Sequence, residues 1–596
     1  MKSRNLVVLM FMLFCSRGFA AATQAAHVPE TAKELHALFE ADWQRQLREN
    51  PLAASDIGDL RYNHLLPDRS PAAIARQQAG VRRSLEKLEA LDRAALSEAD
   101  RLNYDIYRTL LKDSIASFAF RTELMPVDQR GGVHALAVSA TQYVRFATAK
   151  DYRDWTARLR SFGTYTDQTI ALMREGMRTG WTPPRAIMSR VPKQIAEQAG
   201  AKPEASSFYA PFVKMPKSIS AAEQARLRNE GAKAVTEIVL PALQRFQTFF
   251  NDEYLPATRE TVAAGALPEG KAYYEYLARS YTTTELSADE IHAIGLGEVA
   301  RIRAAMEKIR KEVKFEGSLG EFFEHLRTDP KFFHKTPEEL LNAYRALTRR
   351  MDPELVKVFG KLPRTPYGVV PIPASSAPDT TTAYYNGPAA DGSRAGNYYV
   401  NLYKPESRPI WEMVPLSLHE AVPGHHLQIA LSLEQPEQPM FRRLSPFTAF
   451  VEGWGLYAER LGHDMGLYDD PYDRMGQLAY EMWRAVRLVV DTGMHAKGWS
   501  RDRAIAYFKD NAPKTEQDIV NEIDRYIGTP GQALAYKIGQ LKISELRARG
   551  EAKLGEKFDV RAFHDELMST GAVPLSVLEA RMDAWIMARA ADATKL

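Results

Sequence analysis

A helix-start signal recurs along this chain. A serine or threonine followed three residues later by an acid caps a helix, because the two side chains satisfy backbone N–H groups that the first turn leaves free. Apolar residues at helical spacing follow each such pair. We therefore predict a mainly α fold. The pairs are Ser97 with Asp100, Ser287 with Glu290, Thr336 with Glu339, and Thr515 with Asp518.

One stretch interrupts the helical pattern, between about residues 362 and 404. Prolines at positions 363, 366, 371 and 373 and the run NGPAADGSRAG are incompatible with a helix. Within this stretch, Tyr367–Ile372 and Asn397–Tyr403 have the composition of extended strands. We expect a small β-sheet set into the helical body, close to the functional site.

The first 22 residues have the pattern of a secretory signal peptide. Lys2 and Arg4 precede the nine-residue apolar run LVVLMFMLF, and small residues follow around Ala20 and Ala22. The apolar run is far shorter than the ~20 residues that span a bilayer. We expect the protein to be periplasmic or secreted after cleavage near Ala20 or Ala22.

The only cysteine of the sequence, Cys15, lies inside this segment. Lipid attachment at Cys15 is the less favoured alternative, because the bulky Phe14 makes a poor lipoprotein junction. Without the segment the chain has no cysteine, which excludes thiol nucleophiles and zinc–cysteine sites. The segment also holds three of the 78 basic residues and no acid, so 75 basic residues remain against 75 acidic ones. A neutral chain has no overall field for nucleic acid or an anionic membrane.

The remaining chain shows no linker, no repeat and no later apolar stretch of membrane-spanning length. We therefore predict no transmembrane segment and a single catalytic unit over residues 23–596. Its N-terminal helical half extends to about residue 285, and its metal-site half begins at about residue 286.

The stretch SLHEAVPGHHLQ carries the chemistry of the second half. It places His419, Glu420, His425 and His426 within eight residues. Histidine is a common zinc ligand, and metallopeptidases place a glutamate beside the first ligand as general base, as in the helical H-E-x-x-H motif. The strict motif is absent, because Pro423 occupies the position of the second histidine.

Pro423 determines which histidine can share a metal ion with His419. In an undistorted helix His425 would face away from His419, and His426 would lie ~10 Å further along the axis. Because Pro423 and the following glycine disfavour regular helix, we expect a bulge at residues 422–424 that brings His425 to the position of the second ligand. His426 is the alternative second ligand.

A third ligand is expected from the helical stretch AFVEGWGLYAERL. Glu452 in this stretch fits the carboxylate ligand of a His2Glu zinc site, which leaves one coordination position for water. Glu459, seven residues later on a similar face, is a candidate for orienting a ligand histidine. The predicted cofactor is one zinc ion.

Four strings of the sequence resemble the bacterial proteins grouped as domain of unknown function 885: HEAVPGHHLQ, VEGWGLYAE, RLVVDTGMHAKGWS and GTPGQALAYKIGQ. The resemblance covers most of the chain, to about residue 590. Such proteins look like distant relatives of the helical gluzincin peptidases, the neurolysin-like and Taq-type carboxypeptidase group. The resemblance implies a large helical shell around a deep channel over one zinc ion. It also implies that His419, His425 and Glu452 bind the metal and that Glu420 activates water.

The group that stabilises the oxyanion is a separate prediction. Tyr536 follows a glycine-bearing turn, as the corresponding tyrosine often does in helical gluzincins, and its alternative is a structural role on a helix surface. Arg487, Asp491 and His495 form a row on one helix face. Arg487 and His495 are candidate oxyanion donors or substrate-carboxylate ligands, and the alternative is a charge ladder that stabilises the helix.

These features together predict an exported zinc metallopeptidase, an exopeptidase or oligopeptidase that acts on short peptides. The strand Asn397–Tyr403 is a candidate sheet edge for pairing with an extended peptide, and its alternative is an ordinary internal strand. Two other functions are alternatives for the whole protein. One is a non-catalytic periplasmic binding or chaperone-like protein with a degenerate metal site, and the other is a zinc amidase acting on acylated amino acids.

Overall fold

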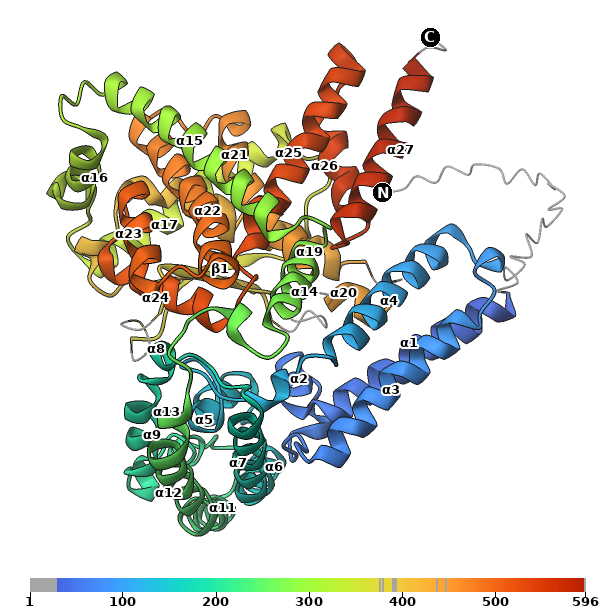
Figure 1. Ribbon diagram of the computed structural model, residues 1–596, viewed down its shortest axis with the longest axis vertical. Helices are drawn as coiled ribbons and strands as arrows, with labels where there is room; N and C mark the ends of the chain where they lie inside the picture. Colours follow the sequence, from blue (N-terminus) through green and yellow to red (C-terminus); the bar gives the residue numbers. More distant parts are fainter. Residues whose placement is uncertain are drawn as a thin grey trace, which may run out of the picture.

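The computed structural model describes residues 29–593, except 375–376, 378–379, 389–393, 436–437 and 445–446. Helices make up most of this part of the chain, and one small sheet accompanies them (Figure 1). The predicted mainly α fold is therefore confirmed, while the deep channel and the division at about residue 285 stay predictions. The expected signal peptide and Cys15 lie outside the described residues. Within these residues, no helix is both long enough and apolar enough to cross a membrane.

The first helices form an elongated arm, which is blue in Figure 1. Its apolar faces enclose a separate small core that includes Leu35, Phe39 and Tyr107. Phe441 from the second half packs against this core, with its ring centroid 4.8 Å from that of Phe39. The arm is thus attached to a distant part of the chain. Its helices are α1 (Glu30–Glu49), α2 (Pro51–Asp56), α3 (Pro71–Glu89) and α4 (Glu98–Ser117).

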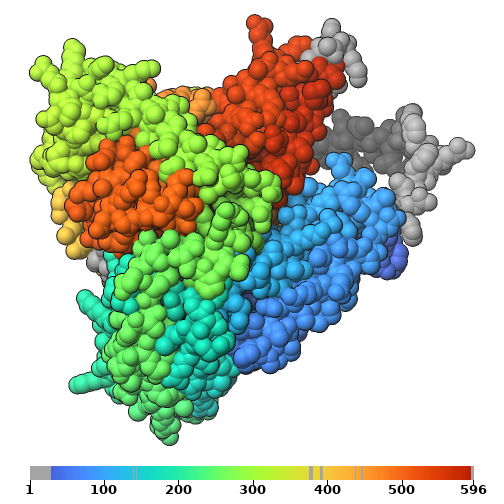
Figure 2. Space-filling view, in the orientation of Figure 1, coloured from blue at the N-terminus to red at the C-terminus, as the bar shows by residue number. Residues whose placement is uncertain are grey.

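A second group of helices forms the lower part of the molecule in Figures 1 and 2. Two π-helical segments, Val235–Val239 and Phe250–Tyr254, join α11, α12 and α13 into one continuous rod. The helices of this group are α5 (Leu136–Tyr143), α6 (Ala149–Arg160), α7 (Phe162–Thr179), α8 (Arg185–Met188), α9 (Val191–Ala199), α10 (Ala210–Val213), α11 (Ala221–Ala234), α12 (Leu240–Phe249) and α13 (Leu255–Ala257).

The second half of the chain is built around α22, in which almost every residue from Met475 to His495 is buried. α15 packs along α22, and α21 packs along α25. The helices are α14 (Gly270–Thr282), α15 (Ala288–Glu312), α16 (Leu319–Thr328), α17 (Pro337–Met351), α18 (Met413–Glu420), α19 (His425–Leu433), α20 (Met440–Leu444), α21 (Thr448–Met465), α22 (Pro471–Lys497), α23 (Arg501–Asn511), α24 (Glu516–Gly528), α25 (Leu534–Leu554), α26 (Val560–Met568) and α27 (Leu575–Ala593).

Short 3-10 helices occupy many of the connections. They are η1 (Leu60–Tyr62), η2 (Arg93–Ala95), η3 (Thr122–Leu124), η4 (Val133–Ala135), η5 (Pro203–Ala205), η8 (Ala264–Ala266), η9 (Pro330–Phe332), η10 (Asp352–Lys357), η12 (Pro405–Ser407), η13 (Ile410–Glu412) and η14 (Gly555–Lys557). One hydrophobic core extends through both halves of the chain, from Ile106 to Met582.

The predicted helix starts are confirmed at the level of hydrogen bonds. The side chains of Ser97, Ser287, Thr336 and Thr515 each accept a bond from the backbone N–H three residues later. At Ser287 and Thr336 the acidic side chain also bonds back to the cap backbone, which completes a capping box.

The small sheet has three strands in the order β1-β3-β2. β1 (Tyr367–Pro371) pairs in parallel with β3 (Gly396–Val400), and β2 (Ala383–Asn386) pairs with β3 in antiparallel orientation. The strands predicted around 367–372 and 397–403 are present, whereas β2 was not predicted. Because β3 has a partner on each side, the prediction that it forms a peptide-binding edge is wrong.

Candidate metal centre

His419 and His425 lie on either side of a break between two helices. α18 ends one residue after His419, and α19 begins at His425. The turn between them contains a cis Val422–Pro423 peptide bond. The turn requires glycine at position 424, because a Cβ on Gly424 would lie 1.9 Å from the carbonyl oxygen of His419. The predicted bulge is therefore an interruption of the helix, since regular helical backbone does not accommodate the proline.

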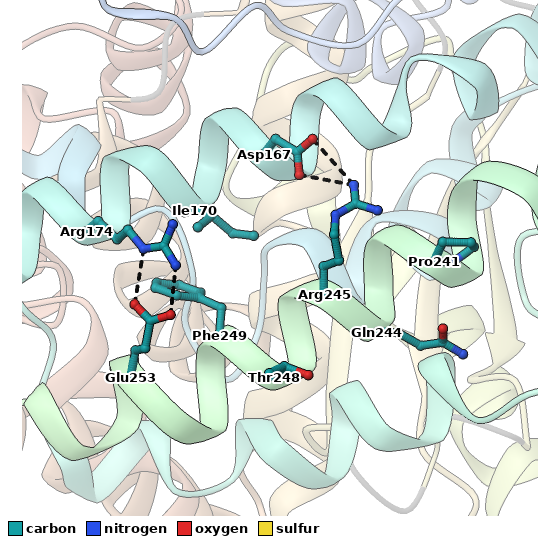
Figure 3. Close-up of a pocket in the computed structure, with 9 residues that line it drawn as sticks. All are labelled: Asp167, Ile170, Arg174, Pro241, Gln244, Arg245, Thr248, Phe249 and Glu253. Atoms are coloured by element: carbon teal, nitrogen blue, oxygen red, sulfur yellow. Dashed lines mark hydrogen bonds and ion pairs between the residues drawn. The ribbon is translucent and has the colours of Figure 1, made fainter.

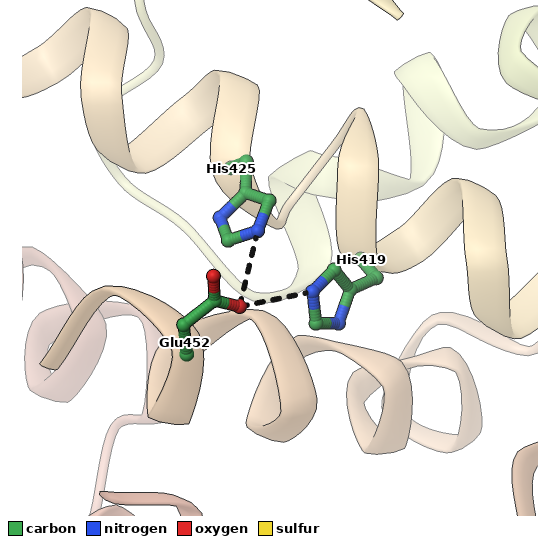
Figure 4. A group of neighbouring side chains, drawn as sticks. All are labelled: His419, His425 and Glu452. Carbon is green, nitrogen blue, oxygen red and sulfur yellow. Dashed lines mark ion pairs between the residues drawn. The ribbon is translucent and has the colours of Figure 1, made fainter. Parts of the chain in front are cut away.

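The break turns His425 back toward His419, and both side chains point at Glu452 on α21 (Figure 4). Nε2 of His419 lies 3.6 Å from Oε2 of Glu452, and Nε2 of His425 lies 3.5 Å from the same oxygen. These distances are too long for good hydrogen bonds. Two ligands of one tetrahedral zinc ion lie about 3.3–3.5 Å apart. The three side chains thus have both the chemistry and the spacing of a zinc ligand set.

The three side chains differ in exposure. His419 is 3% exposed and His425 is 11% exposed, while Glu452 is 21% exposed. The histidine side of the centre is therefore closed by protein, and the carboxylate side is the more open one. Catalytic zinc sites combine protein ligands with one open position in this way, whereas structural sites are closed.

The charges at this centre are strongly coupled. Burial alone would lower the pKa of His419, but the carboxylates of Glu452 and Glu459 raise it to about 9. Burial would likewise raise the pKa of Glu452, yet His425 and His419 hold it well below its usual range. Glu452 is therefore ionised, which is the form in which a carboxylate binds a metal ion.

Glu459 fixes the orientation of His419. Its Oε1 accepts a hydrogen bond from Nδ1 of His419 at 2.8 Å, and its side chain is fully buried. This bond directs Nε2 of His419 toward Glu452. When the ring gives up its second proton to bind a metal ion, Nδ1 keeps its hydrogen and Nε2 offers the lone pair. Arg484 on α22 lies 3.5 Å from the same carboxylate oxygen and offsets its buried charge. The structure thus places Glu459 where the sequence predicted it, behind a candidate ligand histidine.

A glycine allows α21 to lie directly against the His419 ring. A Cβ on Gly455 would be 2.8 Å from Cε1 of His419 and 2.9 Å from its Nε2. Any larger residue at this position would therefore displace the imidazole of His419. Gly455, the second glycine in the string VEGWGLYAE, thus allows α21 and α18 to pack closely.

His426, the alternative ligand, does not join the group. Its Nε2 lies 3.1 Å from the carbonyl oxygen of Thr365, and its Nδ1 lies 2.8 Å from the hydroxyl of Tyr385 on β2. Since a carbonyl only accepts, Nε2 carries the hydrogen and Nδ1 accepts from Tyr385. Burial lowers the pKa of His426 to about 4, so the ring is neutral. Both of its nitrogens are used to attach α19 to the sheet region.

Glu420 is the neighbour of His419 at the end of α18, and it is partly exposed. Among the described residues it makes no hydrogen bond or ion pair. Its carboxylate contributes to the raised pKa of His419, which places it beside the centre. Glu420 is therefore adjacent to the candidate ligands and free to act on a bound molecule.

Tyr536 and Arg487 lie together beside Glu452. The Arg487 guanidinium is centred 4.2 Å from the centroid of the Tyr536 ring. Burial raises the pKa of Tyr536, and the charge of Glu452 raises it further, so its hydroxyl stays protonated at neutral pH. Arg487 donates to the Tyr526 hydroxyl at 2.7 Å and to Glu522 at 3.0 Å. Nη1 of Arg487 has no hydrogen-bond partner among the described residues. Tyr536 and Arg487 are therefore both available as donors.

The other members of the α22 row are engaged elsewhere. Asp491 accepts hydrogen bonds from the Tyr274 hydroxyl at 2.6 Å and from the Gly531 amide at 3.0 Å. Nδ1 of His495 accepts from the backbone amide of Ala264 at 3.1 Å, and its Nε2 donates to the carbonyl of Tyr526 at 3.1 Å. With both ring nitrogens occupied by backbone, His495 is not a free oxyanion donor. The row is not a charge ladder either, since its members bond to different elements.

Two residues near the centre were not predicted from the sequence. Arg484 approaches Glu459, and Tyr385 holds His426 away from the ligand group. Arg484 lies one helical turn before Arg487 on α22, so the same face of that helix could have indicated it. No comparable signal exists for Tyr385, because its strand was not predicted.

Comparison with known proteins defines the class. Residues 51–582 match the family described as bacterial protein of unknown function (DUF885), so this chain belongs to that family. No curated protein matches the chain.

Two solved structures share the fold. One is described as a candidate lipoprotein from Colwellia psychrerythraea; it is 29% identical, has a TM-score of 0.89, and the match covers 94% of this chain and all of the other. The second is described as a candidate lipoprotein of unknown function from Shewanella oneidensis. It is 18% identical, has a TM-score of 0.71, and the match covers 93% of this chain and all of the other.

Proposed function

We propose that this protein is an exported zinc-dependent metallopeptidase that hydrolyses short peptides. The observation that carries the proposal is the convergence of His419, His425 and Glu452, whose ligand atoms all lie within 4.8 Å of one another. Two imidazoles and one carboxylate are the ligand set of glutamate-type zinc peptidases. The long N–O distances and the partly exposed carboxylate support a catalytic site in preference to a buried ion pair.

Zinc bound by these residues would lower the pKa of a water molecule to about 7 and polarise the scissile carbonyl. Glu420 accepts the proton of the attacking water and transfers it to the leaving amine, since it is adjacent to His419 and has no other partner in the described chain. Glu459 holds His419 in the tautomer that binds metal.

The Tyr536 hydroxyl donates a hydrogen bond to the developing oxyanion. Its proximity to Glu452 places it at the centre, and Arg487 beneath its ring fixes the ring position. One such donor is worth about 10²–10³ in kcat. Tyr536→Phe should lower kcat by this factor with little change in zinc content.

Export is the remaining part of the proposal. It is supported by the signal-like pattern of residues 1–22 and by the 29% identical Colwellia protein, which is described as a candidate lipoprotein. The intact mass of protein recovered from cells tests it. An N-terminus near Ala20 or Ala22 supports a cleaved signal peptide, and a lipid on Cys15 supports an anchored form. A full-length chain in the cytoplasm contradicts export.

A peptide-library digest read by mass spectrometry tests the activity. Zinc-loaded wild-type protein should cleave short peptides, and Glu420→Gln should bind zinc without cleaving them. The positions of the cuts assign the enzyme as an exopeptidase or an oligopeptidase. Zinc-loaded wild-type protein that cleaves no peptide would contradict the proposal.

A further inference from the structure

A surface hollow of about 710 Å³ is lined by charged residues that pair with one another. It lies between α7 and the rod that contains α12 (Figure 3). Arg174 pairs with Glu253 at 2.7 Å, and Arg245 pairs with Asp167 at 3.1 Å, so the cations in the hollow already have anionic partners. A groove of this kind does not require a charged ligand.

A smaller cavity of about 320 Å³ in the first half differs in its charges. Its volume falls in the range of small-molecule sites, about 300–1,000 Å³. It is formed by residues of α2, α5, α6, α7 and neighbouring loops. The lining residues are Leu52, Ala53, Ser55, Asp56, Arg69, Gly132, Leu136, Ala140, Arg158 and Tyr165.

Arg158 in this lining is a buried cation without a carboxylate partner among the described residues. It is fully buried, and it donates to the carbonyls of Leu65 and Tyr62 and to the hydroxyl of Ser55. Its Nη1 has no hydrogen-bond partner in the described chain. Burial lowers the pKa of Arg158 to about 10. Because a buried charge is costly unless it is paired, the surroundings of Arg158 favour an anion.

Arg69 adds a second cation to the same lining. Its guanidinium is centred 5.0 Å from the ring centroid of Tyr165, and no carboxylate within the described residues pairs with it. The acid in the lining, Asp56, has its pKa raised by burial. The lining therefore contains two guanidinium groups and one carboxyl group, whose charge burial disfavours, so its net charge is positive.

The lining also includes the apolar side chains of Leu52, Leu136 and Ala140 and the ring of Tyr165. We propose that this cavity is a binding site for a small organic carboxylate with an aliphatic body, whose carboxylate pairs with Arg158 and Arg69. The apolar wall takes the aliphatic part, and a guanidinium binds a carboxylate with charge-assisted hydrogen bonds. None of the residues that line the cavity belongs to the metal centre.

Octanoate is a suitable probe, and octanol is its uncharged control. Isothermal titration of the full-length protein should give saturable binding of octanoate and at least tenfold weaker binding of octanol. Arg69→Gln should weaken octanoate binding by about tenfold or more, since one charge-assisted contact is lost. Ala140→Phe should block binding by filling the cavity, which keeps a test available if the first variant does not fold.

A matched control is available in the same half. Arg82 also lies over an aromatic ring, 5.1 Å from the centroid of Phe118, but it does not line the cavity. Arg82→Gln should leave octanoate binding unchanged. Octanol that binds as well as octanoate, or wild-type affinity in both Arg69→Gln and Ala140→Phe, would overturn the proposal.

The carboxylate can belong to a free small molecule or to the C-terminus of a peptide. A peptide with a free carboxyl group and its C-terminal amide distinguish these sources, measured on Glu420→Gln to prevent any hydrolysis. Binding of the free-acid peptide that needs Arg69 and is lost in the amide identifies a peptide end. Binding of octanoate without the peptide identifies a free carboxylate, and binding of neither contradicts the site.

Discussion

Two regions of the second half contain histidines that the sequence suggests as catalytic or metal-binding residues. The ring nitrogens of these histidines have different partners in the two regions. At the break between α18 and α19, His419 and His425 direct their Nε2 atoms at one carboxylate oxygen, 3.6 and 3.5 Å away. On α22, His495 has both nitrogens bonded to backbone groups at 3.1 Å. The difference lies in the partners of the ring nitrogens, since all three rings are largely buried.

This comparison shows what makes a buried histidine available for chemistry. A ring nitrogen that has no hydrogen bond and lies about 3.5 Å from another metal-binding atom can bind a metal ion. A ring nitrogen that is hydrogen-bonded to the backbone cannot bind a metal ion without breaking that bond. The adjacent residues His425 and His426 repeat the contrast within one turn of helix. His425 faces Glu452, while His426 is bonded to Thr365 and Tyr385.

Replacing each of these two neighbours separately gives the largest expected effect. His425→Ala should abolish both stoichiometric zinc binding and peptide hydrolysis, because a ligand is lost. His426→Asn should retain about one zinc per chain, since His426 binds the sheet region. Zinc content by mass spectrometry of the elements, measured on both folded variants, checks this. Loss of zinc only in His426→Asn would reverse the ligand assignment.

The second-largest effect separates metal binding from proton transfer. Glu420→Gln keeps the size of the side chain but removes the base, so kcat should fall by about 10²–10⁴. Zinc content should stay at the wild-type value, because Glu420 is not a ligand. Steady-state hydrolysis on a cleaved library peptide measures the change, and a variant with wild-type kcat would remove Glu420 from the mechanism.

A smaller effect is expected from the residue behind the ligand. Glu459→Gln removes the charge that holds the hydrogen of His419 on Nδ1, so zinc affinity should fall by about 10–100-fold. Competition with a zinc chelator measures this affinity. Glu551→Gln is the control, because Glu551 pairs with Arg547 on α25 away from the centre. Equal zinc affinity in both variants would show that Glu459 is only structural.

The smallest effect concerns His495 and pH. Burial lowers its folded-state pKa from 6.5 to about 3. Below pH 6.5 the unfolded chain takes up a proton that the folded chain does not, so stability is lost as the pH falls from about 6.5 toward 3. His495→Gln should weaken this pH dependence, as measured by denaturant midpoints at pH 7 and pH 4.5. An unchanged pH dependence, with activity that loses an ionisation near pH 6.5, would return His495 to the active site.

Much of the fold could be predicted because its signals are local. A helix cap such as Ser287 with Glu290 involves residues three apart, so the sequence displays it directly. The convergence of the three side chains was also predictable, since His419 and His425 are close in sequence and Glu452 lies on a recognisable helix. What was missed depends on distant partners. The backbone groups that occupy His495 belong to Ala264 and Tyr526, and no sequence pattern indicates them.

The sheet illustrates the same limit. Composition indicated that β3 is extended, but the position of a strand within a sheet depends on which other strands pair with it. β2 has only four residues, Ala383–Asn386, next to a glycine- and proline-containing stretch, so its strand pattern is too short to recognise. The position of the distortion around Gly424 was predicted, but a bulge was expected and the helix is instead interrupted there. The form of the break depends on the close approach of Gly424 to the carbonyl of His419, which the sequence does not show.

The metal dependence of peptide hydrolysis distinguishes a zinc peptidase from a protein that only binds peptides or metal. Purified wild-type protein should contain or take up about one zinc ion per chain, lose hydrolysis when a chelator removes it, and regain hydrolysis when zinc is returned. The His425→Ala variant should not recover under the same treatment. Peptide hydrolysis that persists in fully metal-free protein, or a wild-type chain that cannot bind zinc, would contradict the account.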